Sequence, residues 1–425
     1  MTKLNRTQSI RTAASRRRFL QASLGTSLVL GVDAIAPQWF AQAATESADS
    51  EDHVLVVIQL SGGNDGLNTV IPYADEEYSK RRPKLGISAQ DVLQVNDTLG
   101  LHPAMKSVAG LVEDGLFSIV QGVGYANPNR SHFESMDIWH SCGRDKAIRR
   151  DGWLGRMFDG LDPSSLPDVP AIHLGASQQP LALRAERTRV PSIRTLDEFR
   201  LTGKRGAELQ QLVAEAANAG GTSTTNDLLG FVQSSTASAM MASERVGKAA
   251  GGSPSGDGYP DSELGRQLSV VARLVAAELP TKVYYLELDG FDTHARQAES
   301  HASLLGEWSD AVTAFVRETR ESGNGERVSV LTFSEFGRRV QENASEGTDH
   351  GAAAPLFLAG AGIQKTIVGE QPSLTDLEDG DLKFSIDFRQ VYASILQDWL
   401  KVDPAEVLQP VDSKSIFEPL PLYKS

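Results

Sequence analysis

The chain has 425 residues, of which 40% are hydrophobic and 23% are charged, so it can bury a large folded core. Its 55 acidic residues outnumber its 41 basic ones, and the resulting formal charge of −14 argues against nucleic-acid binding because an acidic surface repels phosphate backbones. The single cysteine excludes an intramolecular disulfide, and we expect Cys142 to be a buried structural thiol.

The N-terminal segment has the three parts of a removable export signal. Arg16 and Arg17 lie in a basic stretch, an apolar run covers residues 22–36, and a small-residue cleavage site ends at Ala43. The run is interrupted by polar residues and is too short for the roughly 20 apolar residues of a stable membrane span. We therefore expect residues 1–43 to be a twin-arginine signal peptide. The twin-arginine translocase would then deliver the folded protein to the periplasm or outside the cell.

Beyond a polar linker at residues 44–52, predicted strands alternate with amphipathic helices. Short, continuous apolar runs indicate strands covered on both faces at residues 54–60, 116–120, 283–288, 328–333 and 356–358. Helical periodicity covers residues 262–279, 299–320 and 388–400. The alternation predicts a single α/β domain over residues 53–425, with a mostly parallel sheet between helices and a helical excursion at about 195–260.

Ligands of open parallel sheets bind beyond the carboxyl ends of the strands, so the residues that follow each predicted strand are candidates for a site. After the first strand, residues 61–68 read SGGNDGLN. The glycine spacing fits neither a dinucleotide fingerprint nor a P-loop. The paired glycines instead allow a tight turn that aims Asn64 or Asp65 into the cleft, with a plain Asx turn as the alternative.

Residues 127–134 read NPNRSHFE and open a predicted helix with a capping box between Ser131 and Glu134. A hydroxyl at a helix N-terminus can also be a nucleophile, because the backbone N–H groups there favour an oxyanion or a phosphate. The remaining histidines fall into two groups: probable packing or surface positions are expected for His102, His140 and His173, and surface positions for His53 and His301.

Two carboxylates and an imidazole follow the strand predicted at residues 283–288. Asp289, Asp292 and His294 could together supply oxygen and nitrogen ligands to one divalent ion. Such a mixed set suits Zn²⁺, Mn²⁺ or Fe better than Ca²⁺. The alternative is that one of the two aspartates caps the next helix.

Further acids follow the next strand and occupy a glycine-flanked loop. Glu335 follows the strand predicted at residues 328–333 and could be a ligand or a carboxylate at a helix start. In the loop, Asp349 precedes His350, an arrangement that presents an imidazole to a metal or a substrate and lets the acid orient the ring. A surface turn is the alternative for this loop.

The motifs taken together are similar to those of a known family. The chain resembles the twin-arginine-exported domain-of-unknown-function family 1501 at residues 61–73, 101–105, 129–139, 288–294, 332–338 and 348–353. That family looks like a remote branch of the alkaline phosphatase and sulfatase superfamily. The resemblance implies a three-layer α/β/α sandwich and metal-assisted hydrolysis of phosphate or sulfate esters.

The resemblance also implies roles for individual residues. Ser131 falls where the superfamily's nucleophile begins a helix, and we group its neighbour His132 with it as catalytic. Ligands to the metal are implied at Asp65, Asp289, Asp292, His294, Glu335 and His350. Asn64 and Asp349 are expected to support these ligands without contacting the metal. Phe336 stands where the superfamily usually has histidine or asparagine, and the sulfatase Cys/Ser-x-Pro-x-Arg motif is absent. A single ion is therefore expected rather than a two-zinc site.

Two functions follow as expectations. The first is an exported hydrolase that uses a divalent ion (Zn, Mn, Mg or Ca) to cleave a small ester or a sulfated or phosphorylated substrate. The second, motivated by Phe336, is a catalytically inactive exported protein that uses the same fold to bind a partner or a polysaccharide.

Overall fold

One mixed sheet organises the residues that the computed structural model describes. These are residues 53–146, 149–163, 165–167, 169–175, 177–193, 258–408 and 417–424. The predicted signal peptide and linker, and the predicted helical excursion up to residue 257, lie outside the described residues.

Within the described residues the sheet has nine strands, and its order is β11-β5-β10-β9-β1-β8-β6-β7, with β14 also paired to β5. The strands are β1 (Val54–Ser61), β5 (Phe117–Gly124), β6 (Ala171–Leu174), β7 (Ser192–Ile193), β8 (Val283–Asp289), β9 (Val328–Phe333), β10 (Ala354–Gly360), β11 (Ile367–Val368) and β14 (Ile386–Asp387). Each of the five predicted strand segments is found in this sheet, and the expected α/β fold with a mostly parallel sheet is confirmed.

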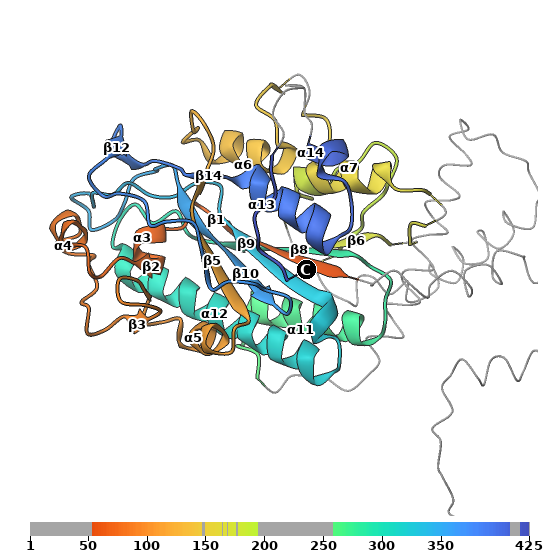
Figure 1. Ribbon diagram of the computed structural model, residues 1–425, viewed down its shortest axis with the longest axis horizontal. Helices are drawn as coiled ribbons and strands as arrows, with labels where there is room; N and C mark the ends of the chain where they lie inside the picture. The colour runs from red at the N-terminus through yellow and green to blue at the C-terminus, as the bar shows by residue number, and fades with distance from the viewer. Residues whose placement is uncertain are drawn as a thin grey trace, which may run out of the picture. The chain divides into compact units, whose positions relative to one another are not determined.

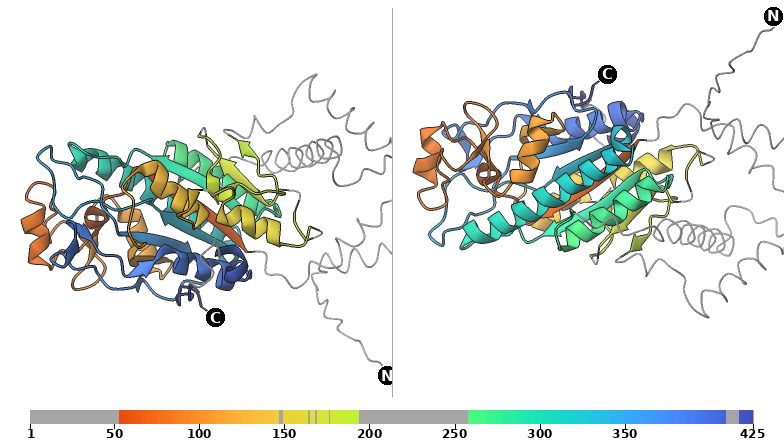
Figure 2. Two further views of the ribbon diagram at one scale, coloured as in Figure 1. Left: turned by 90° about the horizontal axis from the view of Figure 1, so that it is seen from above. Right: turned by 90° about the horizontal axis from the view of Figure 1, so that it is seen from below.

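Helices cover both faces of the sheet (Figures 1 and 2). On one face pack α5 (Lys106–Glu113), α11 (Glu263–Ala276) and α12 (Gln297–Glu321). On the other pack α6 (His132–Ser141), α7 (Trp153–Gly160), α13 (Phe388–Ser394) and α14 (Pro404–Leu408), with a π-helical turn at Ile395–Trp399. Alternate residues of β1 enter the two cores, Val56 and Ile58 on the first face and Leu55 and Val57 on the second, as a strand covered on both sides requires.

Smaller elements surround the main sheet. They are α3 (Gly66–Thr69), α4 (Glu76–Arg81), a small sheet of β2 (Val70–Ile71), β3 (Leu93–Gln94) and β4 (Gly100–Leu101), a hairpin of β12 (Leu377–Glu378) and β13 (Asp381–Leu382), and 3₁₀ turns at Leu181–Leu183 and Gly325–Arg327. Among the described helices, none combines the length and the apolar character needed to cross a membrane.

The reversed direction of β10 decides where the loops meet. β8 and β9 run parallel to β1, whereas β10 is antiparallel to both β9 and β5. The residues before β10 therefore reach the same edge of the sheet as the residues after β1, β5, β8 and β9. This edge brings together residues that lie up to about 290 positions apart in the chain, between Gly62 and His350.

Candidate metal centre

Four side chains converge at this edge, and we call them the histidine cluster: His132, Asp292, His294 and His350. Asp292 Oδ1 lies 3.0 Å from the Nε2 atoms of both His294 and His350, and 3.5 Å from Nε2 of His132. The Nε2 atoms of His294 and His350 are 2.9 Å apart. His132, Asp292 and His350 each offer a ligand atom within 4.8 Å of the others. The cluster thus presents three imidazole nitrogens and a carboxylate around a common point.

Hydrogen bonds on the far side of each ring set which nitrogen faces that point. Nδ1 of His350 lies 2.8 Å from the carbonyl oxygen of Arg130. A carbonyl only accepts, so Nδ1 carries the hydrogen and Nε2 of the neutral ring keeps its lone pair. His132 directs Nδ1 to Glu335 Oε1 at 2.8 Å, and His294 directs Nδ1 to Asp349 Oδ1 at 3.4 Å. All three rings are therefore oriented to present Nε2 to a shared partner.

This arrangement fits a bound cation. Lone pairs on two Nε2 atoms 2.9 Å apart repel each other unless a proton or a cation neutralises them. Nε2 of His132 is buried and has no hydrogen-bond partner within the described residues. Zinc–nitrogen bonds of roughly 2.0–2.1 Å place tetrahedral ligand atoms about 3.3 Å apart. The separations of 3.0 to 3.5 Å between Asp292 Oδ1 and the three Nε2 atoms, and of 2.9 Å between the Nε2 atoms of His294 and His350, lie on both sides of that value.

Arg338 fixes the position of Asp292. Its buried guanidinium donates to Asp292 Oδ1 at 2.8 Å and to the carbonyl oxygens of Phe291 at 2.9 Å and Thr348 at 2.8 Å. The same group donates to the carbonyl oxygen of Gly63 at 2.6 Å. Burial opposes ionisation of Asp292, but the hydrogen bond and the charge of Arg338, together with the neighbouring imidazoles, outweigh it and lower the pKa of Asp292 to about 2. The carboxylate therefore stays charged at any physiological pH.

Glu335 orients His132. Its buried Oε1 accepts from the His132 ring at 2.8 Å and from the backbone N–H of Gly62 at 2.9 Å. The hydrogen bond to Glu335 holds the pKa of His132 above its ordinary value. The close approach needs glycine at position 62, because φ is +116° there and a Cβ atom would lie 2.3 Å from the backbone nitrogen of Asp292. Glu335, predicted as a ligand, thus acts on the cluster through His132.

Phe336 forms an apolar wall beside the cluster. The buried ring centre lies 4.7 Å from that of His350 and 4.9 Å from that of His132. Ser131 is the N-cap of α6 as predicted, but its side chain makes no capping bond, so the predicted capping box is wrong. Glu134 pairs instead with Arg149, at 2.7 Å. Ser131 is exposed, and it directly precedes His132 in the sequence.

Asp65 lies away from the cluster, in the interior. Its two oxygens accept from Arg82, at 2.5 and 3.0 Å, and Oδ2 also accepts from Gln297 at 2.5 Å. Burial is the largest single influence and would raise its pKa, but the charge and hydrogen bonds of Arg82, with smaller contributions from His301 and Gln297, together lower it to about 2. Because both oxygens are occupied and only 1% of the residue is exposed, the expectation that Asp65 binds the ion is not met.

Four other predicted positions also differ in detail. Asn64 turns inward, where its Oδ1 accepts from His301 at 2.9 Å, so the paired glycines do not aim it into a cleft. His301 itself is buried, which corrects its predicted surface position. Asp289 is exposed and accepts from the N–H of Gly290. Asp349 faces His294 rather than His350, which it was expected to orient.

The remaining minor histidines and the cysteine behave largely as expected. His102, His140 and His173 are buried, and His53 is partly buried with its ring stacked on Trp399. Cys142 is buried, and burial raises the pKa of its thiol to about 12. Neither the buried histidines nor the thiol contributes to the histidine cluster.

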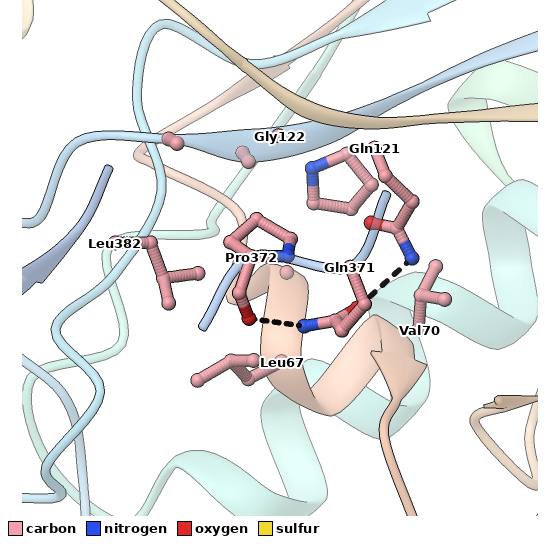
Figure 3. Close-up of a pocket in the computed structure, with 11 residues that line it drawn as sticks. Leu67, Val70, Gln121, Gly122, Gln371, Pro372 and Leu382 are labelled. Carbon is pink, nitrogen blue, oxygen red and sulfur yellow. Dashed lines mark hydrogen bonds between the residues drawn. The ribbon is translucent and has the colours of Figure 1, made fainter. Parts of the chain in front are cut away.

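A small hollow of about 10 Å³, roughly enough for one water molecule, lies between β5, β10 and α3 (Figure 3). Its wall is largely apolar, and Gln121 donates to Gln371 across one side at 3.1 Å. Ligand pockets are usually about 300–1,000 Å³ and contain convergent polar groups. The residues that line the hollow do not include the histidine cluster, so we place the site at the cluster.

Sequence reasoning missed three buried residues that support the loops of the site. Arg338 was visible only as one of two arginines after Glu335, and neither Arg82 nor Gln297 belongs to a motif. Their signal lies in the tertiary contacts, because each is buried and bonds to loops far away in the sequence.

Comparison with known proteins identifies the family. The model of the family described as "Protein of unknown function (DUF1501)" matches residues 52–411. The chain belongs to this family. The resemblance predicted from the motifs is therefore confirmed, and no curated protein matches the DUF1501 chain.

Solved structures with a similar fold include three bacterial proteins, each about 9% identical to this DUF1501 chain. The lipoteichoic acid synthase LtaP of Listeria monocytogenes has a TM-score of 0.33, with 86% of this chain and 79% of that chain covered. The C-terminal periplasmic domain of EcEptC from Escherichia coli has 0.36, with 88% and 90% covered. The PsFucS1 sulfatase from Pseudoalteromonas sp. has 0.36, with 85% and 70% covered. At these scores the likeness says nothing about activity.

Proposed function

We propose that this protein is a metal-dependent hydrolase of sulfate or phosphate esters. The observation that carries the proposal is the convergence of three Nε2 atoms on Asp292, with each ring tied through Nδ1 to an oxygen behind it. Nitrogen-rich sets of this kind favour Zn²⁺ over Mg²⁺ or Ca²⁺. His132, Asp292, His294 and His350 would hold the ion, and it would neutralise negative charge on the ester oxygens.

The chain's own groups suit the rest of such a reaction. The cluster side chains are partly exposed, from 20% for His350 to 49% for Asp292, so a substrate can reach them from solvent. The Ser131 hydroxyl is exposed at the start of α6, where the backbone N–H groups of the first turn favour negative charge. We assign Ser131 as the nucleophile. Arg338 keeps Asp292 in the required orientation, and Glu335 does the same for His132.

Metal analysis followed by ester assays tests the proposal. The purified exported protein should contain about one equivalent of divalent metal and should turn over 4-nitrophenyl sulfate or 4-nitrophenyl phosphate after loading with Zn²⁺ or Mn²⁺. Asp292→Asn should abolish tight binding and turnover, because the shared oxygen of the cluster loses its charge. Asp114→Asn is the matched control, since Asp114 is exposed at the opposite edge, just before β5 begins.

The outcomes separate the two functions expected from the sequence. Absence of a bound ion, together with absence of turnover with Zn²⁺, Mn²⁺, Mg²⁺ and Ca²⁺, would refute the hydrolase. A bound ion without turnover of either ester would instead favour the inactive binding protein.

We also propose that the protein is exported through the twin-arginine translocase and acts in the periplasm or outside the cell. The motif at Arg16 and Arg17 and the cleavage site at Ala43 support this. Lysine at both arginine positions should retain the protein in the cytoplasm, and N-terminal sequencing of the exported form should begin at Ala44. Export that persists in the doubly substituted chain would contradict the route.

A further inference from the structure

Two separate loops supply three of the four cluster side chains, and the fourth, His132, is the first residue of α6. One loop follows β8 and carries Asp292 and His294, and the other leads into β10 and carries His350. Neither loop is a regular strand or helix, so their relative position depends on contacts between them. The geometry of the cluster, and hence its affinity for a cation, depends on what sets that position.

Gln297, at the start of α12, touches both loops with one atom. Its Oε1 accepts from the hydroxyl of Thr293 at 3.0 Å and from the hydroxyl of Thr348 at 2.6 Å. Thr293 stands between Asp292 and His294 in the sequence, and Thr348 stands two residues before His350. The single amide oxygen thus links the two loops next to the ligand side chains.

The hydrogen-bond partners of the Gln297 amide fix which end is the oxygen and which is the nitrogen. Gln297 Nε2 lies 2.5 Å from Asp65 Oδ2, and a carboxylate oxygen paired with Arg82 accepts rather than donates. The amino group must face Asp65, so the oxygen must face the threonines. Gln297 and Thr348 are fully buried and Thr293 is 6% exposed, so water does not compete for these bonds.

Arg82, the partner of Asp65, also contacts the second loop. Its Nε donates to the carbonyl oxygen of Val340 at 2.7 Å, and its Nη2 donates to that of Arg339 at 2.9 Å. We call Asp65, Arg82 and Gln297 the buried bridge. It is anchored on the α4 side of the molecule by Arg82 and reaches the ligand loops through the amide of Gln297.

We infer that Gln297 is a positioning residue, which sets the spacing of the two ligand loops and thereby the cation affinity of the histidine cluster. This rests on the proposed function only in that the cluster binds a divalent cation. Ester turnover is not needed for it.

Substitutions at the threonines test the inference with little change of shape. Thr348→Val and Thr293→Val each remove one hydroxyl that donates to Gln297, and Thr348→Ser restores it. Thr281→Val is the matched control, because Thr281 is 1% exposed and donates to the carbonyl oxygen of Val169 at 2.9 Å. Thr281 lies before β8, at the opposite edge of the sheet from the cluster.

The measurement is Zn²⁺ affinity of the full exported chain, by competition with a chromophoric chelator, alongside the midpoint of thermal unfolding. We expect Thr348→Val and Thr293→Val to weaken Zn²⁺ binding at least tenfold and to shift the visible spectrum of the Co²⁺ form. Thr348→Ser and Thr281→Val should stay within about twofold of the unmodified protein. Gln297→Leu should show the largest loss, and the threonine variants decide the matter if it does not fold.

Three results are distinguishable. If the valine variants lower only the unfolding midpoint, as Thr281→Val does, Gln297 is structural and the inference is wrong while the proposed function stands. If Thr348→Ser fails to restore affinity, the hydroxyl contact is not the cause and the inference is likewise wrong. If the unmodified protein binds no Zn²⁺, the inference is wrong, and the proposed function is wrong as well if Mn²⁺, Mg²⁺ and Ca²⁺ also fail to bind and to support turnover.

Discussion

The histidine cluster and the buried bridge each contain an aspartate from a loop that follows a strand, and in each the pKa of that aspartate is held at about 2. In the bridge, Asp65 is buried and faces donors only, so every oxygen has a partner. In the cluster, the Asp292 side chain is 49% exposed and three imidazoles turn their Nε2 atoms towards it. A satisfied buried pair indicates a structural role, whereas acceptors crowded together at the surface are the kind of group that can hold a cation.

Removing Arg82 should break the bridge and have the largest effect on stability. Arg82→Met leaves Asp65 buried without its counter-charge, which typically costs about 3–5 kcal/mol. Urea unfolding measures the change. A loss below about 1 kcal/mol would mean that Asp65 finds another partner or stays hydrated, and would weaken the contrast with the cluster.

Altering Glu335 should affect the cluster more than the fold. Glu335→Gln replaces one of the carboxylate oxygens that accept from His132, Gly62 and Ser334, so the ring is no longer held in one tautomer. Loss of such an orienting partner typically lowers metal affinity about 10- to 100-fold. Chelator competition with Zn²⁺ measures it, and an unchanged affinity would remove Glu335 from the account of the site.

Acid should weaken the bridge through Asp65. Burial raises its pKa, but Arg82, His301 and Gln297 together lower it to about 2 from the ordinary 3.8. A carboxyl group with a lowered folded-state pKa stabilises the fold above pH 4 and loses that contribution as the pH falls from about 4 to about 2. The loss should be about 2 kcal/mol.

The difference in unfolding free energy between the unmodified protein and Asp65→Asn, measured from pH 6 to pH 2.5, isolates this contribution. It should shrink as the pH falls. A constant difference across that range would show that Asp65 keeps its ordinary pKa in the folded protein.

The smallest effect is expected at Phe133, which neighbours His132 but is 87% exposed. Phe133→Ser should change the free energy of unfolding by less than about 0.5 kcal/mol, because little apolar surface is lost from a packed environment. Zn²⁺ affinity should stay within twofold. A larger loss of affinity would mean that α6 moves with this residue, and that the position of His132 depends on more than Glu335.

Much of the site could be predicted because loops at one edge of a sheet meet wherever the strands are recognised. Asp292 and His294 follow from this rule, His350 was chosen because it lies next to an acid in a glycine-flanked loop, and His132 was singled out beside Ser131 as catalytic. The rule failed for Asp65, which also follows a strand. Its partner Arg82 lies 17 residues away beyond a short helix, and no spacing pattern signals such a pair. His301 was placed at the surface because its helix position alone does not reveal the neighbouring loop of Asn64.

The sequence by itself determined the alternation of strands and helices, the family, and the loops that carry ligand-like residues, because hydrophobic periodicity and local motifs are properties of short segments. Only the tertiary structure decided which carboxylate faces solvent and which is neutralised inside. It also decided which nitrogen of each histidine is presented, and which side chain links the two ligand loops. These depend on the antiparallel course of β10 and on contacts between residues far apart in the sequence, 273 positions in the case of Gly62 and Glu335, and a short segment carries no record of them.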